Sequence, residues 1–295
     1  MRTCKLAAFI LLGIFFARPA VAEIHLYVAD HENRTVMKIK EDGTLLWSFP
    51  NNNGHDVQLL KNGNILIVTN EVQEVTPAKE IVWRVGRPLI RTAEAAQRLE
   101  NGHTVIADNG QRAVIELNEK NEEVWRFDVP NNNMRPRPTM RQVRRIANGN
   151  TLICASTEDE VLEVNPAKEI VWRHKVPFPY LALRLENGNT LISSGDGYGS
   201  PRGWFVVEVD KEGKEVWKFG GEGAPEEQQV RFPTGLVRMP DGTTYFAEAQ
   251  GNVIKHVSAD KKIIRKITSP AMRHPCTIVV VDEPAEMGGV AAEKK

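Results

Sequence analysis

The chain has 295 residues, equal numbers of basic and acidic side chains (38 Lys and Arg, 38 Asp and Glu) and 41% hydrophobic residues. The balanced charge excludes a general nucleic-acid-binding protein, which would have a marked basic excess. The apolar content excludes a chain that is disordered throughout.

Residues 1–22 have the pattern of a secretory signal peptide. Arg2 and Lys5 precede an apolar run of 11 residues, and Ala20-Val21-Ala22 form a small-x-small cleavage site before Glu23. The apolar run is too short to span a bilayer, and no later stretch is long and apolar enough to do so. We therefore expect an exported protein, periplasmic or extracellular, with no membrane-spanning segment after cleavage.

A repeated unit occupies the rest of the chain. Its first part is a turn dipeptide that precedes an apolar strand, at Asn62-Gly63, Asn101-Gly102, Asn148-Gly149, Asn187-Gly188 and Asp241-Gly242. Both residues of such a dipeptide tolerate positive φ, so it is the strongest short signal of a hairpin. Its second part is a strand that contains a tryptophan, at Trp47, Trp83, Trp125, Trp172 and Trp217, with a degenerate sixth copy at 263–267. Four short strands per period of about 40 residues predict a β-propeller.

The strands in chain order give the number of blades. The chain after the leader opens with three strands, 24–29, 35–40 and 45–49, that follow no innermost strand. Five innermost strands come later, at 57–60, 95–99, 142–146, 181–185 and 235–239, and a last one at 277–281 has no strand after it. We therefore predict an all-β, six-bladed propeller with four-stranded blades over residues 23–282. The C-terminal strand would complete the first blade, and residues 283–295 would form a disordered tail.

Two residue types have structural explanations in this scheme. A tryptophan at one position of each blade is expected to pack between blades. Cys154 and Cys276, which remain after the leader is removed, would lie on opposite sides of the ring and stay unpaired.

The two faces of the predicted ring differ. One face carries the tight Asn-Gly and Pro-Ala-Lys-Glu turns, and the other carries long, irregular loops. Function concentrates on irregular loops that a rigid scaffold holds, so we expect the site on the second face, at the mouth of the central channel.

Candidate site residues come from two sources. Counting seven positions back from each turn dipeptide gives a residue near the start of five innermost strands: His55, Glu94, Arg141, Tyr180 and Thr234. Further basic residues lie in the adjoining loops: Arg135, Arg137, Arg202, Arg273 and His274. Guanidinium groups suit carboxylate, sulfate or phosphate, so this set predicts an anion site. Alternatively, the arginines pair with glutamates such as Glu94, and His55 is a hydrogen-bonded structural residue.

The repeat resembles that of the PQQ-like β-propeller superfamily, on segments such as LNEKNEEVWRF (117–127) and VDKEGKEVWKF (209–219). The segments GHDVQLLKNGNIL (54–66) and LENGHTVIADNG (99–110) are similar to the arylsulfotransferase-like six-bladed propellers. This resemblance implies an enzyme that transfers a sulfuryl group, with His55 as nucleophile or base and Arg141 on the sulfuryl oxygens. The strand that begins at Glu94 has no histidine, and the chain has no adjacent cysteine pair of the quinoprotein dehydrogenase kind.

Two functional hypotheses follow. The favoured one is a monomeric, non-catalytic, exported binding module for an anionic metabolite or carbohydrate, or for a protein partner, without nucleic acid. The alternative is the arylsulfotransferase-like enzyme. The sequence has no metal-binding or cofactor-binding motif, so neither hypothesis includes a metal or cofactor. An enzyme requires His55, Arg141 and a third donor to converge on one pocket.

Overall fold

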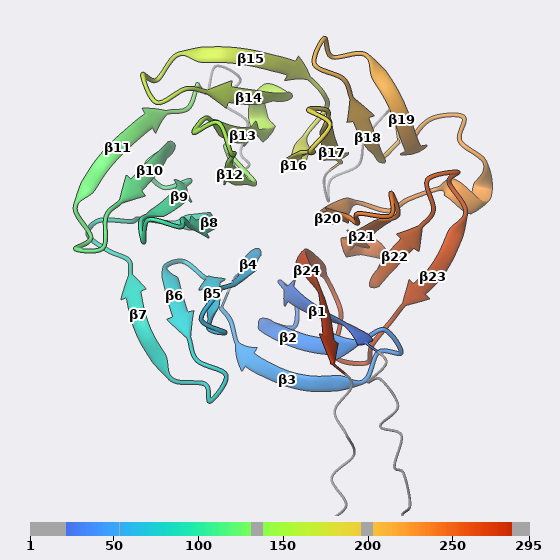
Figure 1. Ribbon diagram of the computed structural model, residues 1–295, viewed down its shortest axis with the longest axis horizontal. Coiled ribbons are helices and arrows are strands. Elements are labelled where there is room, and N and C mark those ends of the chain that lie inside the picture. Colours follow the sequence, from blue (N-terminus) through green and yellow to red (C-terminus); the bar gives the residue numbers. More distant parts are fainter. Residues whose placement is uncertain (1–21, 53, 131–137, 196–202, 285–295) are drawn as a thin grey trace, which may run out of the picture.

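The strands form six antiparallel four-stranded sheets, arranged radially around a central axis (Figure 1). The computed structural model describes residues 22–52, 54–130, 138–195 and 203–284. The predicted six-bladed propeller is thus confirmed. None of the helices in these ranges is long and apolar enough to cross a membrane.

The blades are numbered in chain order, and their strands run from the axis outward. Blade 1 contains β24 (Pro275–Pro284), β1 (Ala22–Asp30), β2 (Thr35–Lys40) and β3 (Leu45–Pro50); blade 2 contains β4 (Asp56–Leu59), β5 (Ile65–Val68), β6 (Val72–Val75) and β7 (Ile81–Val85). Blade 3 contains β8 (Ala93–Arg98), β9 (Thr104–Asp108), β10 (Ala113–Leu117) and β11 (Glu123–Asp128); blade 4 contains β12 (Val143–Arg145), β13 (Thr151–Ala155), β14 (Glu160–Val164) and β15 (Ile170–Lys175). Blade 5 contains β16 (Pro179–Arg184), β17 (Thr190–Ser194), β18 (Phe205–Val209) and β19 (Glu215–Gly220); blade 6 contains β20 (Pro233–Arg238), β21 (Thr244–Glu248), β22 (Val253–Val257) and β23 (Ile263–Ile267). Three short 3-10 helices lie in loops: Ser156–Glu158, Glu226–Gln228 and Ala249–Gly251.

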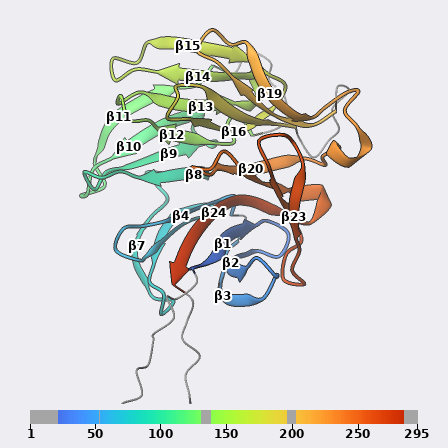
Figure 2. The ribbon, with the colours of Figure 1, turned by 45° about the vertical axis from the view of Figure 1, so that its right-hand side comes forward.

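The C-terminal strand closes the ring. β24 pairs antiparallel with β1, in a register that runs from Ala22 opposite Pro284 to Asp30 opposite Pro275. Figure 2 shows β24 beside β1, so the two ends of the described chain share one sheet. β24 extends to Pro284, beyond the expected end of the propeller at residue 282, because Glu283 pairs with Glu23 in that sheet. Residues 1–21 and 285–295, which hold most of the expected leader and tail, lie outside the described ranges.

The hydrophobic core consists of six clusters, and each lies between two neighbouring blades. Leu66 of blade 2, for example, belongs to one cluster with Ile106 and Ile115 of blade 3. The second strands of blades 2 to 6 are buried along their whole length, because a blade packs on each of their faces. Cys154 on β13 and Cys276 on β24 are both buried and unpaired, which confirms the expectation from the sequence.

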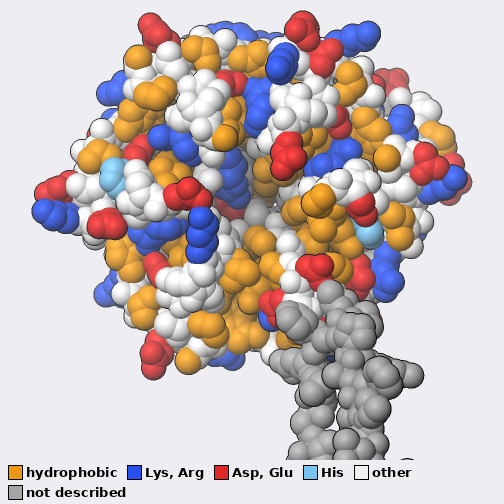
Figure 3. Space-filling model, in the orientation of Figure 1, with side chains coloured by type: hydrophobic (Ala, Val, Ile, Leu, Met, Phe, Trp, Pro, Cys, Tyr) orange, Lys and Arg blue, Asp and Glu red, His pale blue; other side chains and the backbone are white. Residues whose placement is uncertain are grey.

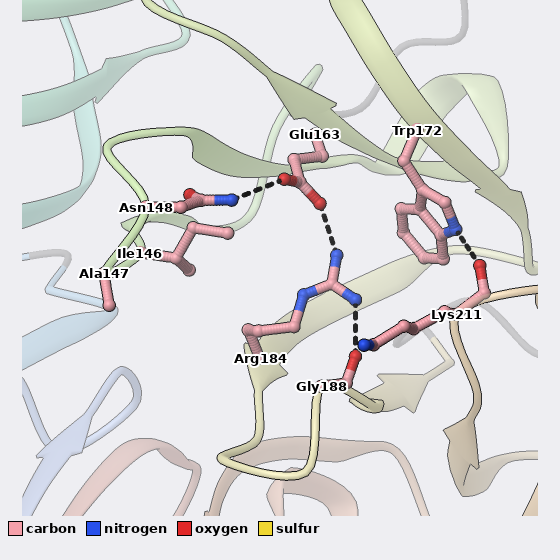
Figure 4. Close-up of a pocket in the computed structure, with 8 residues that line it drawn as sticks. All are labelled: Ile146, Ala147, Asn148, Glu163, Trp172, Arg184, Gly188 and Lys211. Carbon is pink, nitrogen blue, oxygen red and sulfur yellow. Dashed lines mark hydrogen bonds and ion pairs between the residues drawn. The ribbon is translucent and has the colours of Figure 1, made fainter.

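A polar contact repeats at four of the six interfaces, near the Asn-Gly turns. Between blades 4 and 5, Arg184 binds the Glu163 carboxylate and lies over the ring of Trp172, 5.0 Å from its centroid (Figure 4). The Trp172 indole donates to the carbonyl of Lys211 in blade 5 at 3.0 Å. We call this arrangement of Arg, Glu and Trp the blade clasp. The other three clasps are Arg98–Glu74–Trp83, Arg145–Glu116–Trp125 and Arg238–Glu208–Trp217.

The clasps confirm that the tryptophans pack between blades. The arginines come from innermost strands, and Figure 3 shows Lys and Arg side chains (blue) grouped around the hollow at the centre of the ring. The two interfaces of blade 1 lack a clasp. Between blades 1 and 2, Leu59 occupies the position of the clasp arginine, and Lys38 occupies that of the glutamate. Between blades 6 and 1, His256 occupies the position of the glutamate.

Candidate functional site

The five positions counted back from the turn dipeptides meet around one end of the propeller axis, with a sixth from blade 1. Tyr180 Oη lies 3.5 Å from His55 Nδ1, and Cys276 Sγ lies 3.4 Å from the same atom. Arg141 Nη1 donates to Glu94 Oε1 at 2.6 Å. We call the six equivalent residues the axial ring: His55, Glu94, Arg141, Tyr180, Thr234 and Cys276.

A cavity of about 820 Å³ opens above the axial ring. Four ring members line it: His55, Glu94, Arg141 and Tyr180. Its remaining walls come from loops between second and third strands, such as those at His31 and Asn109, and from loops between blades, such as those at Phe232 and His274. The cavity therefore lies on the irregular face, and its volume suits a small organic ligand.

The other candidate residues are distributed unequally. Arg273 is exposed at the cavity wall, and His274 lies half-buried beside it. Thr234 does not line the cavity: its side chain is fully buried, and its hydroxyl donates to the carbonyl of Pro275 at 2.9 Å. Thr234 therefore holds blade 6 against blade 1. Arg135, Arg137 and Arg202 lie outside the described residues.

Arg141 and Glu94 form a buried ion pair between blades 4 and 3. Asn109 fixes the second carboxylate oxygen, since its Nδ2 donates to Glu94 Oε2 at 3.1 Å. Burial raises the pKa of Glu94, although Arg141 opposes the shift. Burial disfavours the charged form of Arg141, but Glu94, Tyr180 and Cys276 together more than offset that effect, so the pKa of Arg141 lies above its ordinary value. The structure thus contains an ion pair between an axial arginine and Glu94, which was one of the two alternatives from the sequence.

His55 is held as a neutral imidazole. Burial lowers its pKa well below the ordinary value, and the nearby Arg141, His31 and His274 act in the same direction. Burial raises the pKa of the Tyr180 hydroxyl and raises that of the Cys276 thiol to about 12, so both keep their protons.

Nδ1 of His55 lies within reach of both the Tyr180 hydroxyl and the Cys276 thiol, and the thiol also donates to the carbonyl of His274 at 3.5 Å. The opposite nitrogen, Nε2, lies 3.9 Å from Glu94 Oε1, which is too long for a hydrogen bond. Nε2 is therefore the nitrogen of His55 that faces a ligand, and it is a donor in the tautomer in which Nδ1 accepts from the Tyr180 hydroxyl.

Sequence reasoning missed several residues of the site, among them Cys276 and His31. Cys276 stands seven residues before Glu283, but the last strand has no turn dipeptide from which to count. His31 stacks on His55, with ring centroids 4.4 Å apart and planes at 18°, and its buried Nδ1 has no hydrogen-bond partner among the described residues.

A signal for His31 was present in the sequence. His31 follows Asp30 at the end of β1, as Asn109 follows Asp108 at the end of β9. Each aspartate accepts two backbone N–H groups of the loop that precedes its blade's innermost strand: Asp30 from Arg273 and His274, and Asp108 from Arg91 and Thr92. A comparison of strand ends would therefore have placed His31 and Asn109 together beside the axial ring.

A layer of polar bridges crosses the axis beneath the ring. Arg144 of blade 4 binds both carboxylate oxygens of Asp56 in blade 2, at 2.9 and 3.0 Å. Gln142 donates to Thr277 of blade 1 at 3.2 Å. We call the Asp56–Arg144 pair the transaxial strut. It lies one residue from His55, so it fixes the floor of the cavity.

The arrangement presents hydrogen-bond donors from Arg141 and His55 together with two acidic groups, the buried Glu94 and the exposed Glu32, which lies beside His274 at the wall. Within the described ranges, no group of three or more His, Cys, Asp and Glu side chains is placed to hold a metal ion. The groove of about 400 Å³ in Figure 4 is lined by side chains that the blade clasp already engages, so it marks an interface between blades.

Comparisons with known proteins identify the fold. No family model matches the sequence, and no curated protein matches it. A protein of unknown function from Bacteroides caccae is 20% identical, with a TM-score of 0.73 over 88% of this chain and 99% of that chain. A streptogramin B lyase is 10% identical, with a TM-score of 0.60 over 86% and 85% of the two chains.

A third solved structure is a catalytically inactive histidine-to-alanine form of virginiamycin B lyase from Staphylococcus aureus, with quinupristin. It is 11% identical, with a TM-score of 0.60 over 90% of this chain and 93% of that chain. At these identities, the likeness shows the six-bladed propeller alone.

Proposed function

We propose that this protein is an exported binding module whose axial cavity takes an anionic small molecule. The observation that carries the proposal is that Arg141 and His55 line one cavity of about 820 Å³. Only one nitrogen of the Arg141 guanidinium binds Glu94, so its other N–H groups can bind a ligand oxygen. The exposed Arg273 at the wall would attract an anion toward the cavity.

The remaining parts of the proposal rest on the sequence. The pattern of residues 1–22 supports export to the periplasm or the cell exterior. Balanced charge supports a ligand other than nucleic acid. A closed ring without a free inner edge supports a monomer.

Sulfuryl transfer at the same cavity is the second candidate. The convergence of His55, Arg141 and Tyr180 supports it. The two candidates make different demands on His55, because its Nδ1 contacts Tyr180 and Cys276 and its Nε2 faces the ligand. A nucleophile or base needs a free lone pair on Nε2, whereas the binding proposal uses Nε2 as a donor.

Thermal shift and calorimetry with sulfated, phosphorylated and carboxylated compounds test the binding proposal. Arg141→Lys keeps the charge but loses the planar pair of donors, so affinity should fall about 10- to 150-fold. Arg184→Lys is the matched control, because it makes the same change in a blade clasp and should leave affinity unaltered. Unchanged affinity in Arg141→Lys would place the site elsewhere.

An assay of sulfuryl transfer from an aryl sulfate tests the second candidate. If turnover occurs and is lost in His55→Ala, the protein is an enzyme. If anions bind without turnover, it is a binding module.

A further inference from the structure

Glu94 is an unusual member of a cavity that takes anions. Its side chain is buried and lines the cavity between Arg141 and His55. Arg141 occupies Oε1 and Asn109 occupies Oε2. A carboxylate has about four lone-pair positions, so Glu94 can still accept a hydrogen bond from a ligand.

The positions of His55 and Glu94 define which hydrogen bonds a ligand atom between them must make. His55 Nε2 and Glu94 Oε1 are 3.9 Å apart, and when Nδ1 accepts from the Tyr180 hydroxyl, the first is a donor while the second is an acceptor. A ligand hydroxyl beside both atoms can accept from Nε2 and donate to Oε1 at once. An ionised oxygen at the same place would accept from Nε2 but would face the carboxylate without a proton, which is repulsive.

We propose that the axial cavity binds an oxyanion that retains a proton more tightly than it binds sulfate. Such an oxyanion is hydrogen phosphate or a protonated phosphate monoester. This inference rests on the proposed function, because it concerns the anion that Arg141 and His55 bind. Arg141 takes the charged oxygens, and Glu94 takes the P–OH group. Sulfate has the same shape but no proton to donate, so Glu94 discriminates against it.

Calorimetric titration of the full chain with inorganic phosphate and with sulfate, at mildly alkaline pH, tests the inference. Both anions then carry two negative charges, and Glu94 is ionised, so the proton on phosphate is the main difference between the ligands. One hydrogen bond to a charged group corresponds to about a tenfold or greater preference for phosphate.

A variant tests the assignment to Glu94. Glu94→Gln removes the acceptor charge and adds an amide donor, so the preference for phosphate should disappear or reverse. Glu163→Gln is the matched control, since it removes a carboxylate that pairs with an arginine in a blade clasp, far from the cavity, and should leave the preference intact. Circular dichroism establishes that each variant is folded, and the wild-type comparison stands even if one is not.

The outcomes separate the two proposals. Equal binding of the two anions by the wild type, or tighter binding of sulfate, overturns the inference but leaves anion binding in place. A phosphate preference that survives in Glu94→Gln also overturns it. Binding of neither anion counts against both the inference and the proposed function, whereas sulfate binding that Arg141→Lys abolishes supports the proposed function alone.

Discussion

The blade clasps and the axial ring use equivalent positions of the same repeat in opposite ways. In the four clasps, each position holds one residue type: Arg on the innermost strand, Glu on the third and Trp on the outermost. In the axial ring, six equivalent positions hold six different residue types. Repetition therefore marks the contacts that every interface needs, and divergence marks the place where the blades face a common centre.

The physical reason is geometric. Each clasp joins a separate pair of blades, so four copies of the same ion pair do not interact. The six ring positions converge on one axis, where identical charged groups would repel one another at short range. Different residues in the ring give an asymmetric site, in which Arg141 neutralises Glu94 and Tyr180 orients His55.

Removal of β24 should break both regions at once. Truncation after Arg273 deletes Cys276 from the ring and leaves β1 as an open sheet edge, so the protein should aggregate or remain unfolded. Size-exclusion chromatography and thermal unfolding measure this. A monomeric truncated chain with an unchanged melting temperature would refute the closure.

Loss of the transaxial strut should affect the ring more than any clasp. Asp56 is 0% exposed, and Asp56→Ala leaves the Arg144 guanidinium without its carboxylate partner, which should cost about 3–5 kcal/mol of the free energy of unfolding. Urea denaturation gives the value. Lys61→Ala is the control: it breaks an exposed pair with Glu100 and should leave the free energy of unfolding almost unchanged. Similar losses in the two variants would mean that the strut does not support the axis.

A clasp variant should lower stability without altering ligand binding. Arg184→Ala leaves Glu163 with hydrogen bonds from Asn148 and Asn150 alone among the described side chains, so we expect a loss of about 1–3 kcal/mol in the free energy of unfolding. Calorimetry with phosphate should show unchanged affinity. A loss of affinity would show that the clasps and the ring are coupled.

The dependence of the free energy of unfolding on pH should reveal the depressed pKa of His55. Because the pKa of His55 is depressed by folding, its contribution is fully favourable above about pH 6.5 and is lost as pH falls toward the folded pKa. Burial lowers the pKa of His274 too, whereas the raised pKa of Glu94 has the opposite effect on stability, and both groups remain in His55→Gln. As pH falls, the free energy of unfolding of the wild type should therefore decrease more steeply than that of His55→Gln. The same dependence of stability on pH in the two proteins would mean that His55 is not held neutral.

Thr234→Val should have the smallest effect and define the limit of the ring. The change removes the hydrogen bond to Pro275 and should cost about 1 kcal/mol of stability. Phosphate affinity should stay the same, because Thr234 does not line the cavity. Reduced affinity for phosphate would show that Thr234 contributes to the binding site.

The sequence predicted the features that depend on local pattern. The Asn-Gly turns and the tryptophans gave the blade number and the closure, and counting from the turns found five ring members. Contacts between blades depend on which positions face the axis, so the partner of Arg144 across the ring was not predictable from spacing. Cys276 was missed because its repeat is degenerate, and His31 because its loop was not aligned with the loop at Asn109.

The closure of the ring also fixes the direction in which the cavity would be presented. Innermost strands run from the irregular face to the turn face, so β24 ends at the turn face, and β1 begins there opposite it. A tether or fusion partner joined at either Ala22 or Pro284 would therefore leave from the side opposite the cavity. The protein could be immobilised by either end of the propeller with its binding face directed outward.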